Sequence, residues 1–330
     1  MAPDPTHTQS PSADGPGPAT LACRGQNAAP LAPTHRPRTT GLVLHHDCWF
    51  LSGPTAVGKS ALAIDLAGRL GAEIVSADSM AVYRGLDIGT AKPTPQEQAR
   101  APHHVIDVVA PSESYSVARW LADAGRAVDA IRLRGNKILF VGGTPLYFRS
   151  VRDGLALLPE GDPALRCELL AEAARSSPLA LHAKLATIDP RAAARLHPND
   201  TRRIVRALEV AQTTGRTLSE SFSPNPHPVF ATQMMILDIS RRLLIARIEQ
   251  RVTEMFSRGL VDEVQAASAL PGGIGPTARQ GAGYAESLDL LAGRIALPEA
   301  IRRTQQRTRQ LAKRQLTWLR SFQDAVWITA

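Results

Sequence analysis

The segment from Gly53 to Ser60 reads Gly-Pro-Thr-Ala-Val-Gly-Lys-Ser and matches the pattern G-x-x-x-x-G-K-[ST]. An apolar run at 48–51 precedes it, and leucines at helical spacing follow it between 60 and 70. This order of strand, glycine-rich loop and helix is the context that supports a phosphate-binding loop, or P-loop. The sequence therefore predicts that the segment binds a di- or triphosphate at the beginning of a helix.

Each part of the predicted P-loop has a chemical role. Its glycines let backbone N–H groups turn toward phosphate oxygens, and the helix N-terminus adds a favourable dipole. Lys59 neutralises phosphate charge, and the hydroxyl of Ser60 is suited to ligate Mg²⁺. The predicted phosphate-binding residues are Gly53, Pro54, Thr55, Ala56, Val57, Gly58, Lys59 and Ser60.

Apolar segments and helical patterns alternate along much of the chain. Short apolar segments predict strands at 48–51, 73–76, 137–141 and 234–239, and helical patterns fill 60–70 and 116–133. Such alternation is typical of α/β proteins, so we predict a P-loop NTPase-like parallel sheet with helices on both faces. Between 163 and 214 the strand signal disappears, which predicts an inserted all-helical subdomain, and long helices are expected from 241 to 330.

These patterns divide the chain into three parts. Residues 1–44 are rich in Pro, Ser, Thr, Gly and Ala without apolar periodicity, and we predict a disordered tail there. The α/β core with its C-terminal helices is expected at 45–155 and 230–330. The helical insertion is expected at 156–229.

The end of the strand at 137–141 bears on the kind of phosphate chemistry. P-loop NTPases hold Mg²⁺ with an acid at the end of a later strand, but Gly142, Gly143 and Thr144 follow this one. The missing acid argues against an ordinary ATPase or GTPase, although the loop is shared with ATP-binding and other nucleotide-binding proteins. A small kinase remains open, as does a transferase whose substrate carries the diphosphate.

Asp78 follows the predicted strand at 73–76. The carboxyl ends of parallel strands face the ligand crevice, so this side chain is expected to point toward the P-loop. It is suited to act as a general base or as a partner of Mg²⁺. A turn or capping aspartate explains the same position equally well.

Basic residues exceed acidic residues by 38 to 30, giving a formal net charge of +8, which favours a polyanionic partner. Arg202, Arg203 and Arg206 lie off the apolar stripe of a predicted helix that contains Ile204 and Val205. A second basic segment, 301–320, has seven cations and no acid. Its cations are Arg302, Arg303, Arg307, Arg309, Lys313, Arg314 and Arg320. A nearby phosphate backbone is the preferred interpretation, and a solvated surface with salt bridges is the alternative.

No signal for secretion or membrane insertion is present. The three cysteines lie far apart without metal-ligand spacing, and no apolar run reaches the roughly 18 residues of a membrane helix. The N-terminus lacks the basic-then-apolar pattern of a signal peptide. We therefore expect a cytoplasmic protein with no membrane association.

Several ordered blocks of sequence resemble the tRNA dimethylallyltransferase (tRNA isopentenyltransferase) family. The likeness covers about residues 47–327. The matching blocks are 53–60, 74–79, 82–93, 102–107, 114–116, 141–147, 197–209, 259–264, 283–284 and 308–315. Two positions depart from the family pattern, because Gly281 replaces a bulkier small residue and Ala285 replaces a Lys or Arg.

The resemblance implies transfer of a dimethylallyl group from dimethylallyl diphosphate to the N6 atom of an adenine in tRNA. The acceptor would be adenosine 37, just 3′ of the anticodon, in tRNAs that read U-initial codons, and the product N6-isopentenyladenosine. The family pattern further implies Mg²⁺ as cofactor and the anticodon stem-loop as partner, and we expect a monomer.

The resemblance also assigns residues to roles. The catalytic residues would be Asp78 as general base together with Lys59, Thr55 and Arg251, although Arg247 is an equal candidate for neutralising the leaving diphosphate. The insertion at 156–229 would contact tRNA. The implied tRNA contacts are Asp78, Ser79, Met80, Ala81, Thr144, Arg166, Arg202, Arg203, Ile204, Val205 and Arg206.

Two rival functions remain at this point. One is another enzyme of the same fold, which prenylates free adenine nucleotides or phosphorylates a small metabolite. The other is a non-catalytic tRNA-binding protein, which would keep the basic surface but would not need both Lys59 and Asp78.

Overall fold

The computed structural model describes residues 47–153, 158, 161–221 and 234–329. These residues fall into two compact units, which we call the core unit (47–153 and 234–329) and the helical unit (158 and 161–221). The predicted tail at 1–44 lies outside the described residues, as do residues 222–233. Each unit is considered by itself.

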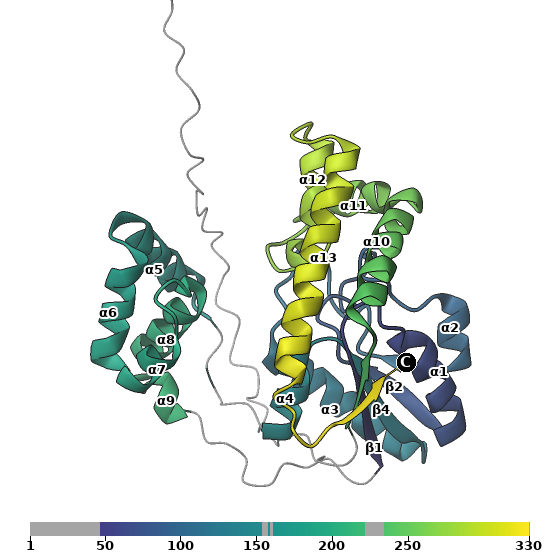
Figure 1. Cartoon of the computed structure of the whole chain (residues 1–330). Helices are drawn as coiled ribbons and strands as arrows, with labels where there is room; N and C mark the ends of the chain where they lie inside the picture. Colours follow the sequence, from purple (N-terminus) through teal and green to yellow (C-terminus); the bar gives the residue numbers. More distant parts are fainter. Residues whose placement is uncertain (1–46, 154–157, 159–160, 222–233, 330) are drawn as a thin grey trace, which may run out of the picture. The chain divides into compact units, whose positions relative to one another are not determined.

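A six-stranded sheet, parallel throughout, forms the centre of the core unit (Figure 1). Its strand order is β3-β2-β4-β1-β5-β6. The strands are β1 (Cys48–Ser52), β2 (Ala72–Ser76), β3 (His103–His104), β4 (Lys137–Gly142), β5 (Met234–Asp238) and β6 (Val326–Thr329). Buried parallel strands are apolar on both faces, which explains the unbroken apolar runs of β1 and β4.

Helices cover both faces of this sheet, as predicted. Phe50 and Phe140 point to one face, where Trp120 packs, whereas Leu51 and Leu139 point to the other. The first face is covered by α3 (Val117–Leu133) and α4 (Pro145–Asp153), and the second by α1 (Lys59–Leu70), α10 (Arg241–Ser257) and α13 (Leu297–Leu319). The remaining elements of the core unit are α2 (Pro95–Arg100), α11 (Leu260–Ala269), α12 (Tyr284–Leu291) and the short 3₁₀ helix η1 (Ala278–Gln280).

The helical unit has a small core of its own. Leu169, Leu181, Leu185, Ile204 and Leu208 pack together in it, and its described residues contain no strand, in agreement with the predicted helical segment. Its helices are α5 (Pro163–Arg175), α6 (Pro178–Ile188), α7 (Pro190–Arg195), α8 (Thr201–Thr214) and α9 (Leu218–Ser221). A proline opens α5, α6 and α7 after an Asp or Ser N-cap, because proline lacks the N–H that a first turn leaves unpaired.

Two edge strands were not predicted. The chain from 241 to 330 is not wholly helical, since β6 pairs in parallel with β5. β6 is mostly exposed and β3 has only two residues, so neither carries the apolar run that identified the central strands. Short edge strands of this kind take their conformation from their neighbours rather than from their own sequence.

The close approach of β4 to the end of β2 gives a test of the fold. A Cβ added to Gly142 would lie 2.1 Å from the carbonyl oxygen of Ala77. We predict that Gly142→Ala lowers the free energy of unfolding by about 1–3 kcal/mol, measured by urea denaturation. Gly68→Ala in α1, where no heavy atom lies within 4 Å of the new Cβ, is the control and should raise it by about 0.5–1 kcal/mol. Equal effects of the two substitutions would contradict this account.

Candidate active site

The P-loop connects β1 to α1 at the carboxyl edge of the sheet. Gly53 has a φ of +150°, and a Cβ there would lie 2.7 Å from the carbonyl oxygen of Leu237 in β5. Gly58 has a φ of +105° and opens α1 without a side-chain cap. The first turn of α1 contains no acid, and Ser60 within it is exposed. The helix N-terminus therefore presents uncapped N–H groups suited to an anion.

The ammonium of Lys59 folds back onto the loop. Its Nζ donates to the carbonyl oxygens of Gly53 (2.9 Å) and Pro54 (2.7 Å). Desolvation lowers the pKa of Lys59 to about 8, while the Asp78 carboxylate opposes that shift and Arg251 adds to it. The loop thus holds a cation whose charge is destabilised by burial, and an incoming anion would stabilise it.

Two arginines of α10 reach the P-loop. Arg251 donates from Nη1 to the hydroxyl of Thr55 (3.2 Å), and Arg247 donates from Nη1 to the carbonyl oxygen of Val57 (3.1 Å). Burial lowers the pKa of Arg251, and the Asp78 carboxylate opposes that shift as well. Arg251 is therefore the arginine that interacts with both Thr55 and Asp78, whereas Arg247 bonds the backbone further along the loop.

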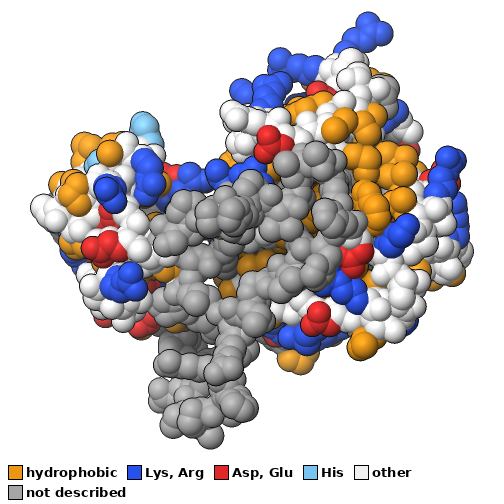
Figure 2. Space-filling model, turned by 90° about the horizontal axis from the view of Figure 1, so that it is seen from below, with side chains coloured by type: hydrophobic (Ala, Val, Ile, Leu, Met, Phe, Trp, Pro, Cys, Tyr) orange, Lys and Arg blue, Asp and Glu red, His pale blue; other side chains and the backbone are white. Residues whose placement is uncertain are grey.

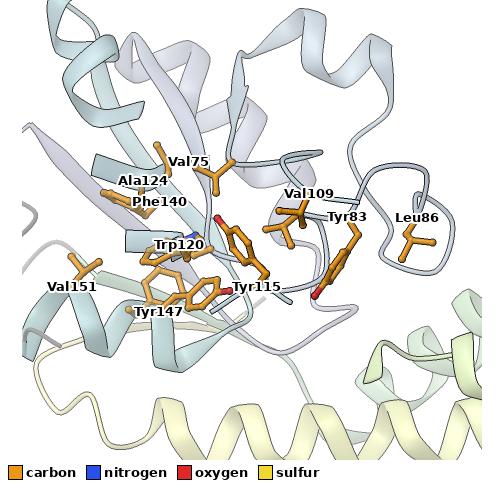
Figure 3. Close-up of a cluster of buried hydrophobic side chains, with 14 of the residues drawn as sticks. Val75, Tyr83, Leu86, Val109, Tyr115, Trp120, Ala124, Phe140, Tyr147 and Val151 are labelled. Atoms are coloured by element: carbon orange, nitrogen blue, oxygen red, sulfur yellow. The ribbon is translucent and has the colours of Figure 1, made fainter. Parts of the chain in front are cut away.

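Asp78 lies just after β2, whose last residue, Ser76, is held through its backbone. The indole N–H of Trp120 donates to the carbonyl oxygen of Ser76 (2.8 Å), and the Trp120 ring stacks on Tyr147 with centroids 4.2 Å apart (Figure 3). One carboxylate oxygen of Asp78, Oδ1, accepts from the N–H of Met80 (2.8 Å), as in a turn aspartate. Within the described residues Oδ2 accepts no hydrogen bond. The turn interpretation of Asp78 therefore holds for Oδ1, and the role as general base stays a prediction for Oδ2.

The electrostatic partners of Asp78 place its carboxylate on the same side of the sheet as the P-loop. It raises the pKa of both Lys59 and Arg251, which requires proximity to these two cations. The carboxyl ends of β1 and β2 lie on either side of β4 and share one edge of the sheet. The anion site and the carboxylate consequently face each other.

Thr144 ties the loop after β4 to the loop after β2. The N–H of Ser79 donates to the Thr144 hydroxyl oxygen (3.0 Å), and the N–H of Thr144 donates to the carbonyl oxygen of Ala77 (3.2 Å). Met80 is partly buried and Ala81 fully buried in the same loop. The structure thus brings together the core residues for which an acceptor contact was predicted.

The predicted contacts of α5 and α8 lie in the helical unit. Arg166 and Arg206 both pair with Glu209, whose carboxylate is fully buried, and Arg203 pairs with Asp200. The side chains of Ile204 and Val205 are buried in the core of that unit, which differs from the predicted tRNA contact for these two residues. They pack α8 against the rest of the helical unit.

The basic run on α13 is less uniform than its sequence indicates. Arg302 and Arg303 pair with Glu299, Arg307 with Glu286, and Arg309 with Glu249. Three cations, Lys313, Arg314 and Arg320, are exposed and have no carboxylate partner in the described chain. The prediction of seven unrelieved charges is therefore wrong for four of them. Glu299, one turn earlier in the same helix, pairs with two of them, and Glu286 and Glu249, which are distant in sequence, pair with the other two. On the face shown in Figure 2, acidic side chains lie scattered among the Lys and Arg side chains.

Two residues that bond to the loops of the core unit were not identified from the sequence. Gln315 of α13 accepts from the N–H of Thr55 and donates to the carbonyl oxygen of Gly143. Glu263 of α11 accepts from the N–H groups of Asp87, Ile88 and Gly89. Both lie in sequence blocks that were singled out, but a hydrogen bond to a distant backbone group leaves no periodic pattern.

The described residues contain no group of three or more His, Cys, Asp or Glu side chains arranged to hold a metal ion. His103 and His104 have structural partners instead, namely the carbonyl oxygen of Ala101 and the carboxylate of Glu73. Any metal at the P-loop must therefore take most of its ligands from a bound phosphate group and water.

Comparison with known proteins gives consistent matches over most of the chain. The family model "IPP transferase" matches residues 81–322, and the model "Isopentenyl transferase" matches residues 46–104. A tRNA dimethylallyltransferase of Anaeromyxobacter dehalogenans is 50% identical over 280 residues, covering 84% of this chain and 93% of that protein.

Two solved structures are also similar. The tRNA isopentenylpyrophosphate transferase of Bacillus halodurans has a TM-score of 0.61 and 41% identity, covering 86% of this chain and 89% of its own. A eukaryotic dimethylallyltransferase acting on tRNA has a TM-score of 0.71 and 30% identity, covering 85% and 73%.

The depressed pKa of Lys59 gives a test that needs only inorganic diphosphate. The ammonium attracts the anion and the neutral amine does not, so binding favours the protonated form. The dissociation constant should rise as pH increases through about 8, approaching a tenfold rise per pH unit. Isothermal titration calorimetry from about pH 7 to about pH 10 measures this. Lys59→Arg keeps its charge over that range and should give a flat profile, whereas a flat wild-type profile would rule out the assignment.

Proposed function

The chain belongs to the tRNA dimethylallyltransferase family, and from that premise we propose that it transfers a dimethylallyl group from dimethylallyl diphosphate to N6 of adenosine 37 in tRNA. The reaction is a prenyl transfer that modifies tRNA. The observation that carries the proposal is the Asp78 carboxylate facing two desolvated cations, Lys59 and Arg251, at the P-loop.

In the proposed reaction, N6 of adenine forms a bond to C1 of the dimethylallyl group while the bond from C1 to the diphosphate oxygen breaks. The electrons of the broken bond leave with the diphosphate. The N6 proton passes to the carboxylate of Asp78, because an exocyclic amine conjugated to the ring is a weak nucleophile until a base accepts its proton. Oδ2 is the oxygen available for this step, since Oδ1 holds the N–H of Met80.

The departing diphosphate gathers negative charge, and the P-loop supplies cations for it. Lys59 and Arg251 approach from the loop and from α10, and the N–H groups of α1 add their dipole. Fixed charges of this kind act without reorganisation as the bond breaks. Thr55 positions Arg251 through its hydroxyl.

Mg²⁺ fits the donors available at this end of the loop. The residue Ser60 is exposed in the first turn of α1, and hydroxyl and phosphate oxygens are the ligands that Mg²⁺ prefers. We propose Ser60 as its protein ligand. When bound, the ion supplies positive charge that offsets the diphosphate.

The acceptor adenine must leave its stack to approach Asp78. Bases in single-stranded loops are splayed out at low cost, which favours an anticodon stem-loop as the substrate element. Ser79, Met80 and Thr144 line the approach to the carboxylate and are proposed to hold the base. Arg166 and the arginines of α8 are proposed to contact the tRNA backbone from the helical unit.

The expected product is N6-isopentenyladenosine in tRNAs that read U-initial codons. We further propose that the protein acts as a cytoplasmic monomer. Among the described residues, no helix is both long and apolar enough to traverse a lipid bilayer.

Direct tests compare tRNA with free nucleotides. Transfer of the dimethylallyl group to tRNA, with no transfer to AMP, supports the proposed acceptor. Mass spectrometry of tRNA nucleosides from a deletion strain should show loss of N6-isopentenyladenosine. Its persistence, or preferred transfer to AMP, would refute the proposal in favour of a nucleotide prenyltransferase.

Asp78→Asn isolates the proposed base, because the amide oxygen can still accept from Met80 but the side chain cannot take a proton. The rate of transfer should fall about 10²- to 10⁴-fold, while tRNA affinity changes less than about threefold. Single-turnover transfer and filter binding measure the two quantities. Asp65→Asn, an exposed residue of α1, is the control and should leave both unchanged. Retained transfer in Asp78→Asn would remove the assignment of the base.

The exposed cations of α13 lead to a separate prediction about tRNA binding. Lys313→Ala should weaken binding and lower the slope of log affinity against log salt by about one, as expected for one lost phosphate contact. Arg302→Ala, whose guanidinium already pairs with Glu299, should have a smaller effect on the slope. Equal slopes for the two variants would indicate that Lys313 faces solvent and makes no contact with a tRNA phosphate.

A further inference from the structure

Gln315 of α13 forms hydrogen bonds with two loops at the active site, the P-loop and the loop after β4. Its Oε1 accepts from the N–H of Thr55 in the P-loop (2.9 Å), and its Nε2 donates to the carbonyl oxygen of Gly143 after β4 (2.6 Å). The residue is 9% exposed. A buried amide with both ends hydrogen-bonded is held in one orientation, and so are the two backbone groups that it joins.

The two loops that Gln315 joins serve different parts of the proposed reaction, namely diphosphate binding and presentation of the base. Thr55 also holds Arg251, which faces the diphosphate side. Gly143 precedes Thr144, which accepts from Ser79 beside the Asp78 base. Gln315 therefore connects the P-loop to Gly143 by hydrogen bonds, and the next residue, Thr144, is hydrogen-bonded to the loop that presents the carboxylate.

The surroundings leave little freedom for this amide. A Cβ on Gly143 would lie 2.6 Å from Nε2 of Gln315 and 3.6 Å from the carbonyl oxygen of Gly53. The absence of a side chain at Gly143 thus permits the amide to approach both loops. This arrangement combines a long side chain on one element with a glycine on another.

The other buried polar residues of α13 behave differently. The hydroxyls of Thr304 and Thr308 donate to carbonyl oxygens four residues earlier in their own helix. These bonds satisfy buried hydroxyls and reach no other element. Gln315, on the same buried side of α13, directs both its polar atoms out of the helix.

We propose that Gln315 is a positioning residue, which sets the distance between the diphosphate cradle and the Asp78 loop. This inference rests on the proposed function, because it concerns the alignment of the two substrates. Each loop keeps its own binding groups without Gln315, so binding of either substrate alone depends little on it. Alignment of the reacting atoms depends on it strongly, and a displacement of about 1 Å can cost on the order of 10²-fold in rate.

Gln315→Met tests the proposal with a side chain of similar length and volume that makes neither hydrogen bond. The expected result is a roughly 10- to 100-fold lower kcat, with KM for dimethylallyl diphosphate and Kd for tRNA within about threefold of wild type. Gln310→Met, an exposed residue of the same helix, should leave all three quantities unchanged. A purely structural role would instead lower the melting temperature and leave kcat per folded molecule unchanged.

Gln315→Glu provides a second variant in case the Met variant does not fold. Its carboxylate still accepts from the N–H of Thr55 but has no proton for the carbonyl oxygen of Gly143. It should therefore show the same loss in kcat with tRNA binding retained, whereas the added negative charge beside the P-loop is expected to raise KM for dimethylallyl diphosphate as well.

The outcomes separate the two proposals. A wild-type enzyme that transfers no dimethylallyl group to tRNA overturns the proposed function. An active wild type with kcat of the Gln315 variants within about twofold overturns the positioning role alone, and so does a loss confined to KM. A selective loss of kcat supports it.

Discussion

The site depends on the burial of positive charge opposite one carboxylate. Lys59 and Arg251 both lose hydration at the P-loop, and for both of them the pKa is lowered by burial and raised by Asp78. One carboxylate opposite two cations leaves the cluster with excess positive charge. The diphosphate of the proposed substrate would supply the missing negative charge, so the same desolvation that destabilises the two cations would favour its binding.

The sheet makes this arrangement possible because it places loops from distant parts of the chain at one edge. β4 lies between β1 and β2, so the loop after β4 is bounded by the P-loop on one side and by the Asp78 loop on the other. Gly142 and Gly143 let the three loops approach without side chains between them. The spacing of the three loops is thus set by contacts between their backbones. Trp120 also fixes the end of β2, because its indole N–H donates to the carbonyl oxygen of Ser76.

The elements with strong local patterns were predictable from the sequence. The P-loop, the central strands and the helical segment each carry a motif or an apolar period that tertiary contacts reinforce. β6 and β3 were missed because their conformation comes from neighbouring strands. The charges of α13 were misjudged for a related reason, since Glu249 and Glu286 are distant in sequence and only the fold brings them to Arg309 and Arg307. Gln315 could not be identified from the sequence for the same reason. It bonds to two backbone groups on other elements, and such contacts leave no periodic pattern of residues.

Packing also explains why glycine stands at position 281, where the family pattern has a bulkier residue. A Cβ there would lie 2.7 Å from the ring of Tyr284 and 3.2 Å from Sδ of Met80. The Tyr284 hydroxyl donates to Glu263 (2.9 Å), whose carboxylate also holds three backbone N–H groups of the loop at 87–89. That network fixes the ring, so a larger residue at 281 must displace either the tyrosine or Met80 beside the proposed base. The absence of a side chain at Gly281 therefore allows the close approach of Tyr284 and Met80.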